Sequence, residues 1–283
     1  MSPKKNGGGH PTLLVGVSNP ATVGHLVHLS SLLAGAGPFE ILLTHVVTVA
    51  SQISLTSGRS SPEVVRARDF LQGALREAEA YGLKARALVE VARSVDEGLV
   101  AASESRGARL ILVGYSEEEA NEDDRREKRF DRTMHRVARN ADCDLVVAKF
   151  RRKELRTILV PLGTEPRLQV TGLLCRALGS VAGTTFRFLH VIEPGSPAAE
   201  ARRRAEEILA SEGLTDLGDL DVVAGESVPD TIEARAVDFD LVILGPAASS
   251  SPMDALFTST GEKIAERVPS SVLLTRAKSG RGG

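Results

Sequence analysis

Short runs of Val, Ile and Leu alternate along the chain with longer stretches in which apolar residues recur at helical spacing. Runs that are apolar at consecutive positions are typical of strands buried on both faces of a parallel sheet. The pattern predicts strands at 12–17, 39–47, 84–91, 109–113, 144–149, 157–162, 184–191, 219–224, 240–244 and 271–275. It predicts helices at 21–35, 61–82, 94–107, 129–140, 167–181, 197–212, 228–237 and 259–268.

The landmarks of this pattern occur twice, in the same order. His45 ends the second strand of the first half and His190 that of the second, at an offset of 145 positions. A repeat of this length indicates two domains rather than a solenoid, and we place them at 11–150 and 155–277. Each half alternates strands with helices from beginning to end, and right-handed crossovers then favour a doubly wound sheet.

The composition of the chain limits the kinds of partner and the cellular compartment that we expect for the protein. The 283 residues include 35 basic and 37 acidic ones, a balance that argues against a nucleic-acid partner. No stretch approaches the roughly 20 apolar residues that span a bilayer, so we expect no membrane insertion. The first ten residues contain no apolar core of a signal peptide. Cys143 and Cys175 have no metal-binding or redox spacing, and we expect a cytoplasmic protein.

The last helix and strand of each half, at 136–147 and 262–274, are alike. Together with the Leu-Thr-His-Val, Leu-His-Val, Val-Gly and Leu-Gly strand ends, they make the chain resemble the universal stress protein family in its tandem, two-domain form. The likeness extends from 12 to 276. The closing segments are also similar to universal stress domains attached to membrane transporters.

The resemblance implies a fold and a way of pairing. It implies two α/β domains with five-stranded parallel sheets in the order 3-2-1-4-5, like adenine nucleotide alpha hydrolases and flavodoxin. It also implies that the domains pair through their last strands, 144–149 and 271–276, as a pseudo-dimer within one chain. Two chains could pair further as a homodimer.

ATP-binding members of the family carry Gly, two residues, Gly, nine residues, Gly and then Ser or Thr. Their glycines let backbone amides approach phosphate oxygens at the start of a helix, and an Asp after the first strand contacts adenine. In the second half only the first glycine, Gly245, is kept. The candidate nucleotide cleft there comprises Leu162, Gly163, Val191, Gly245, Ala248, Thr258, Ser259 and Thr260.

Two interpretations of this cleft remain open. The hydroxyls at 258–260 could donate to phosphate, which would make ATP or another adenine nucleotide the ligand. Alternatively, Ser259 and Glu262 could form a capping box that needs no ligand. The second interpretation is favoured, and no cofactor is expected.

The first half departs further from the nucleotide-binding pattern. Glu117 stands at the second glycine position, and Asp131 and Arg132 replace the last Gly-Ser pair. Carboxylates beside phosphate oxygens repel them, by about 1 kcal/mol per pair at contact distance even in water. We therefore expect the first half to have lost the ATP site.

Other polar residues give weaker signals. His45 and His190 are interpreted as structural histidines facing the cleft, with a titratable switch as the alternative. His25 and His28 lie one helical turn apart without a carboxylate or cysteine nearby in sequence, so no metal site is expected. No nucleophile, base and acid occur in a recognised catalytic motif, and we expect no enzyme.

Three functions follow as hypotheses. The chain could be a non-enzymatic stress-response or regulatory module that acts through contacts with another protein. It could be a nucleotide sensor that uses the cleft of the second half. It could also be a cytosolic regulatory domain for a membrane transporter.

Overall fold

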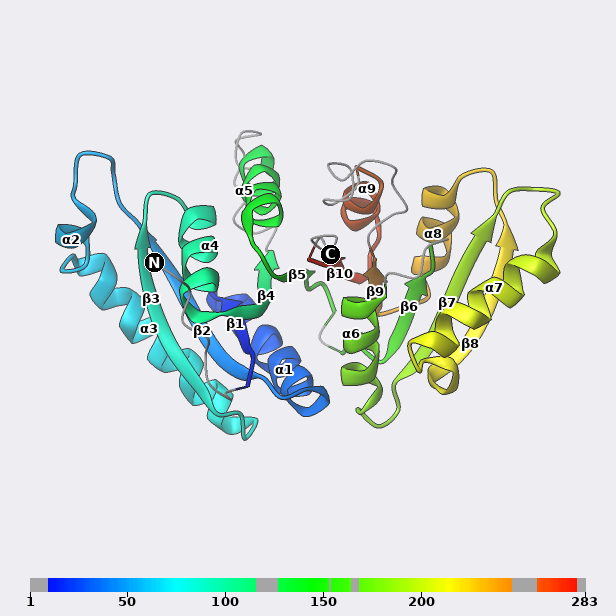
Figure 1. Cartoon of the computed structure of the whole chain (residues 1–283), viewed down its shortest axis with the longest axis horizontal. Coiled ribbons are helices and arrows are strands. Elements are labelled where there is room, and N and C mark those ends of the chain that lie inside the picture. Colours follow the sequence, from blue (N-terminus) through cyan, green and yellow to red (C-terminus); the bar gives the residue numbers. More distant parts are fainter. Residues whose placement is uncertain (1–9, 116–126, 153, 164–167, 246–258, 279–283) are drawn as a thin grey trace, which may run out of the picture.

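The structure, a computed structural model, describes residues 10–115, 127–152, 154–163, 168–245 and 259–278, with the backbone alone at 127–131 and 259–260. Figure 1 shows strands running through both halves, with helices above and below them. The strands are β1 (Thr12–Gly16), β2 (Glu40–Thr48), β3 (Ala85–Ala92), β4 (Ala108–Tyr115), β5 (Asp144–Lys149), β6 (Thr157–Pro161), β7 (Thr185–Ile192), β8 (Gly218–Ala224), β9 (Leu241–Leu244) and β10 (Ser271–Arg276).

The helices cover both faces of the sheet. They are α1 (Pro20–Ala36), α2 (Leu55–Gly58), α3 (Pro62–Ala80), α4 (Val95–Arg106), α5 (Glu127–Asn140), α6 (Gln169–Gly179), α7 (Ala198–Ser211), α8 (Val228–Ala236), α9 (Ser259–Arg267) and the 3-10 turn η2 (Thr215–Leu217). Each predicted helix and strand is present. The sequence pattern missed α2 and η2.

Helix ends follow local chemistry. The Asn19 side chain accepts a hydrogen bond from the Ala21 N–H at 2.9 Å at the start of α1, and Pro20 takes the first helical position. Gly82 and Gly213, at φ 67° and 66°, follow the ends of α3 and α7, where the left-handed conformation stops a helix.

The strands form one sheet in the order β3-β2-β1-β4-β5-β10-β9-β6-β7-β8. Each half therefore has the predicted order 3-2-1-4-5, with all strands parallel. The α/β fold class is confirmed. The prediction of two five-stranded sheets is corrected in one respect, because the halves join edge to edge into a single sheet of ten strands.

The joint is the antiparallel pair β5–β10, as the resemblance implied. Val147 lies opposite Leu274, and both residues are the fourth of their strands. Repeat-equivalent residues thus face each other, which makes the contact a pseudo-two-fold one. On one face of the sheet, α1 packs against α6 across the joint (Figure 1).

The hydrophobic core lies in layers on either side of the sheet. On the face covered by α1, α3, α6 and α7, one cluster continues across both halves, from Leu13 in β1 to Leu273 in β10. On the other face, each half has its own cluster, under α4 and α5 or under α8 and α9. Strands apolar at every position are thereby buried on both faces.

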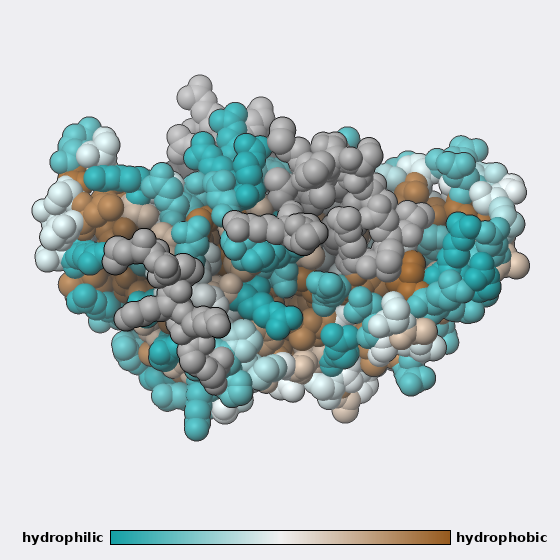
Figure 2. All heavy atoms as spheres, in the orientation of Figure 1, coloured by the Kyte–Doolittle hydropathy of each residue, from teal (hydrophilic) through white to brown (hydrophobic). Residues whose placement is uncertain are grey.

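The outer surface differs between the two ends of the molecule. Figure 2 shows hydrophilic residues over α7 and hydrophobic residues gathered beside α2. Near α2, the side chains of Ile53 and Leu55 are 47% and 40% exposed. Within the described ranges, no helix combines the length and apolar character needed to cross a membrane.

Candidate functional site

The candidate cleft of the second half lies at the carboxyl ends of β6 and β9. These strands are neighbours in the sheet, so the residues that follow them, Leu162, Gly163 and Gly245, meet at one edge. Ligands of open α/β sheets usually bind at this edge. Leu162 is buried and its N–H donates to the Leu189 carbonyl at 2.8 Å, whereas Gly163 is exposed.

The other predicted cleft residues are placed less completely. Val191 is half-buried in β7, the strand next to β6. Ser259 and Thr260 are the first two residues of α9, whereas Ala248 and Thr258 lie outside the described residues. The structure thus brings the backbone of the predicted strand ends together, and the predicted phosphate loop remains a prediction.

The capping box of Ser259 and Glu262 stays a prediction. Position 258 and the side chain of Ser259 lie outside what the structure describes, so the observed start of α9 does not test it. The Glu262 carboxylate reaches across the joint, where its Oε1 lies 2.8 Å from Nε2 of His135 on α5. This residue therefore connects the two halves.

The two glycines that end the fourth strands have different surroundings. A methyl group at Gly245 would lie 3.5 Å from Thr171 Oγ1, which is ordinary contact. A methyl group at Gly114 would lie 3.1 Å from Leu26 Cδ1 and 3.3 Å from Thr22 Oγ1. Gly114 is therefore packed closely under α1, whereas the contact of Gly245 is known for the described residues alone, which leave out 164–167 and 246–258.

A pair of buried hydroxyls lies beneath Gly245. The Thr171 and Thr275 Oγ1 atoms are 3.2 Å apart, and Thr275 donates to the Leu244 carbonyl at 3.2 Å. Both threonines are almost fully buried. Both hydroxyls have hydrogen-bond partners within the protein. They therefore stabilise the end of β9 and do not need a ligand as a partner.

The two strand-end histidines have the same role in each half. His45 Nδ1 lies 2.8 Å from the Val17 carbonyl oxygen, and His190 Nδ1 lies 3.1 Å from that of Leu162. A carbonyl only accepts, so Nδ1 donates in both cases. Each bond ties β2 or β7 to the residue after the neighbouring strand, which confirms the structural interpretation.

The two thiols are buried in the core. Burial raises the pKa of Cys143 to about 11 and that of Cys175 to about 12. At neutral pH both are therefore protonated, whereas the nucleophile and the metal ligand is the thiolate.

His25 and His28 on α1 pack against aromatic rings, and the Glu77 carboxylate also acts on His25. His25 stacks on Phe150 at 4.8 Å between ring centroids, and His28 lies 5.0 Å from Tyr81. Burial lowers the pKa of both imidazoles. A search of the described residues finds no group of three His, Cys, Asp or Glu side chains that could hold a metal ion.

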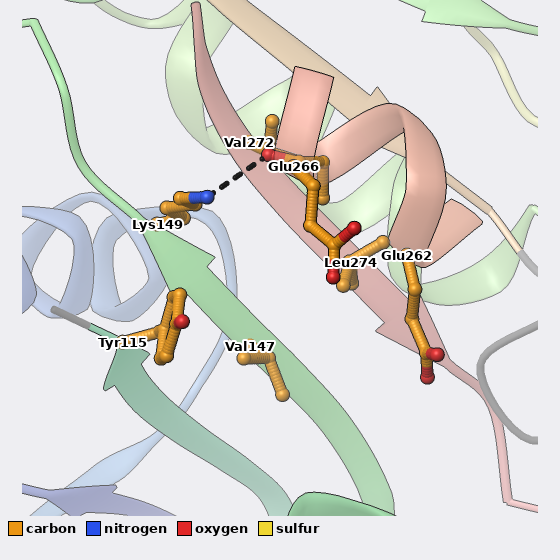
Figure 3. Close-up of a pocket in the computed structure, with 8 residues that line it drawn as sticks. Tyr115, Val147, Lys149, Glu262, Glu266, Val272 and Leu274 are labelled. Atoms are coloured by element: carbon orange, nitrogen blue, oxygen red, sulfur yellow. Dashed lines mark hydrogen bonds between the residues drawn. The ribbon is translucent and has the colours of Figure 1, made fainter. Parts of the chain in front are cut away.

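A pocket that the sequence did not predict lies at the joint between the halves (Figure 3). The buried Lys149 side chain lies along one wall, donates from Nζ to the Ala265 carbonyl at 3.1 Å, and sits 5.3 Å from the centre of the Tyr115 ring. The Glu266 and Glu262 side chains line the opposite wall. The floor is apolar, formed by Val147, Ala265, Val272 and Leu274.

Cations from each last strand bind the end of the other half's last helix. Arg276 donates to the Ala141 carbonyl at 2.7 Å and the Cys143 carbonyl at 3.0 Å, just beyond α5. Lys149, at the equivalent end of β5, donates to Ala265 on α9. A positive charge is favourable at the carboxyl end of a helix, where the helix dipole is negative. The joint is therefore stabilised by these charges as well as by the β5–β10 strand pairing.

Arg151 extends this contact by donating to the carbonyls of Ala265, Glu266 and Val268. One feature of the sequence could have indicated these contacts between the halves. Lys149 and Arg276 occupy the same last position of the repeated final strand.

No protein-family model matches the sequence, and neither does any curated protein. Solved structures do match. A universal stress protein from Archaeoglobus fulgidus DSM 4304 is 17% identical, with a TM-score of 0.65 over 95% of this chain and 97% of its own. A protein of unknown function from Pseudomonas aeruginosa PAO1 is 16% identical, with a TM-score of 0.63 over 95% and 93%.

A third structure, from Pseudomonas aeruginosa UCBPP-PA14 and assigned provisionally as a universal stress protein, is 14% identical, with a TM-score of 0.60 over 94% of this chain and 92% of its own. At these identities the likeness concerns the fold. It extends over both halves of the sheet. This chain therefore has the fold of a universal stress protein along nearly its whole length.

Proposed function

We propose that this chain is a non-catalytic tandem universal stress protein, a regulatory module that acts through contacts with other proteins. The observation that carries the proposal is the loss of the glycine pattern after Gly114. Gly114 lies against Leu26 and Thr22 under α1, and the residues after it are acidic in sequence. Carboxylates there would repel phosphate, so we infer that the first half has lost the ATP site.

The chemistry of the described side chains supports a role without catalysis. The thiols of Cys143 and Cys175 have raised pKa values, and the strand-end histidines donate to backbone carbonyls. None of these groups is paired as a nucleophile with a base.

A nucleotide sensor is the second candidate, and the meeting of Gly163 and Gly245 at neighbouring strand ends of the second half favours it. An adenine nucleotide would occupy the cleft of the second half alone, with hydroxyls at 258–260 near its phosphates. A membrane transporter as the regulated partner is a further prediction of the resemblance, which co-purification with a membrane fraction would test.

Calorimetric titration with ATP separates the two candidates. We expect the natural chain to bind weakly or not at all, and the variant Ala248→Gly with Thr258→Gly to bind at least ~10-fold more tightly, because backbone amides can then approach phosphate. The matched control places Gly at Glu117 and Asp131 of the first half. This control variant should gain no affinity for ATP, because Gly114 remains packed beneath α1.

Tight binding of about one ATP per natural chain, lost when Gly245 is replaced by Val, would instead favour the sensor. Binding of two ATP molecules per natural chain would contradict both candidates, since each requires that the first half has lost its site.

A further inference from the structure

The outer strand of the first half, β3, is an edge strand of the sheet. Among the described residues it pairs with β2 alone and ends the order of strands. α3 packs on one face of β3 and α4 on the other (Figure 1). An edge strand directs a row of backbone N–H and C=O groups away from its one neighbour, and these groups can pair with an added strand.

A groove follows this edge. It is lined by four consecutive residues of β3, Leu88 to Val91. Consecutive residues of a strand point to opposite faces, so a groove lined by all of them runs along the edge itself. Val91 packs with Val64 on the α3 face, whereas Leu88 packs with the α4 cluster on the other face.

Arginines line the groove from both faces. Arg59, just after α2, and Arg68, on α3, line it on one face, and Arg106, at the end of α4, lines it on the other. All three are exposed, and no ion pair involves them among the described residues. Glu90 is the one carboxylate among the lining residues. The groove therefore has excess positive charge.

The opposite edge of the sheet differs in charge. There, β8 carries Asp219 and Asp221, whose carboxylates lie 3.2 and 3.5 Å from Arg187. Asp221 also lies 3.7 Å from Arg235. The arginines beside β8 are thus paired with carboxylates of the strand itself, while Arg59, Arg68 and Arg106 have no such partner among the described residues.

We propose that the β3 edge binds an extended, acidic segment of a partner protein as an added strand. The main chain of the segment pairs with the free edge of β3. Its side chains alternate between faces, so carboxylates at neighbouring positions reach Arg59 and Arg68 on one wall and Arg106 on the other. Guanidinium groups suit carboxylates because two parallel N–H donors match the two oxygens.

Fluorescence anisotropy with the whole chain tests the proposal. The probe is a labelled peptide of about nine residues that repeats Glu-Glu-Val, long enough to cover a typical strand. We expect Arg68→Ala to weaken binding about fivefold, and Arg59→Ala with Arg68→Ala to weaken it more than ~10-fold. Arg66→Ala is the matched control on the same helix, since Arg66 pairs with Glu63 at 2.8 Å and does not line the groove.

Two further peptides separate strand addition from simple charge attraction. A peptide methylated on alternate backbone nitrogens should lose binding, because it cannot complete the ladder, and a Lys-Lys-Val peptide should not bind. Equal binding of the methylated peptide, equal weakening by Arg66→Ala and Arg68→Ala, or no binding of the acidic peptide would each overturn the proposal. Dimerisation of the natural chain that competes with binding of the acidic peptide would assign the edge to a second copy instead.

Discussion

At the scale of residues, the repeat is well preserved where a side chain bonds to the neighbouring strand end. His45 and His190 make the same bond in the two halves. Gly114 and Gly245 keep their place in sequence, and among the described residues Gly114 has the closer neighbours. The sequence could predict the histidines' structural role, whereas the packing of Gly114 depends on the angle at which α1 crosses the sheet.

The buried thiols make stability depend on alkaline pH. The pKa values of Cys143 and Cys175 are raised from 9.0 to about 11 and about 12 by burial. Because the folded pKa lies above the unfolded one, the stabilising effect is full below about pH 9 and is lost as pH rises above it. Urea unfolding between pH 8 and 10.5 should show this fall, and a Cys143→Ala, Cys175→Ala variant should show a smaller one.

Alkylation rates provide the second measurement. At pH 8 the folded chain should react with iodoacetamide at least ~100-fold more slowly than the chain in urea, since reaction requires the thiolate. Rapid alkylation of either cysteine in the folded chain would show that the thiol is accessible and ionised.

At the scale of elements, the hydrophobic pattern was sufficient for every long strand and helix. It failed for α2, where Leu55–Gly58 lies in a Ser- and Thr-rich run with no periodicity. Tertiary contacts hold this segment. A methyl group at Gly58 would lie 2.8 Å from Val49, and the Arg93 guanidinium donates to the Ala50 and Ile53 carbonyls. A single turn of helix with such distant partners leaves no local signal in the sequence.

The cation at the end of β10 should matter more than its surface neighbours. Arg276 is buried and satisfies carbonyls beyond the end of α5, so Arg276→Ala leaves those acceptors without a donor. We expect a loss of about 2–3 kcal/mol of unfolding free energy in urea titration. Lys278, exposed and paired with Asp142 at 2.9 Å, is the control, and its substitution by Ala should cost less than about 1 kcal/mol.

At the scale of the whole molecule, one antiparallel strand pair turns two repeats into one sheet. The resemblance anticipated this pair, but the residues that reinforce it could not be predicted, because Arg276 and Lys149 bond to main-chain carbonyls of the opposite half. The part of the candidate site built from strand ends was predictable from the repeat. The junction pocket was not, since it arises only where the two halves meet.

Separated halves should replace the missing partner with a copy of themselves. If 155–277 is an independent domain, as we propose, its β10 edge is bare, and the pseudo-two-fold contact allows Leu274 to face Leu274 of a second copy. Sedimentation should show homodimers of 155–277 and of 11–150, and mixing them should restore the paired species. A stable monomer of either half would indicate that the β5–β10 contact contributes little.

The reversal of strand direction between β5 and β10 has a consequence for any binding partner. Within each half the strands are parallel, so the carboxyl ends of the first half and those of the second lie on opposite long edges of the sheet. A partner lying along one edge would meet the cleft of one half and the amino ends of the other half's strands. Two partners that each occupy one cleft would therefore lie on opposite edges of the sheet and could bind at the same time.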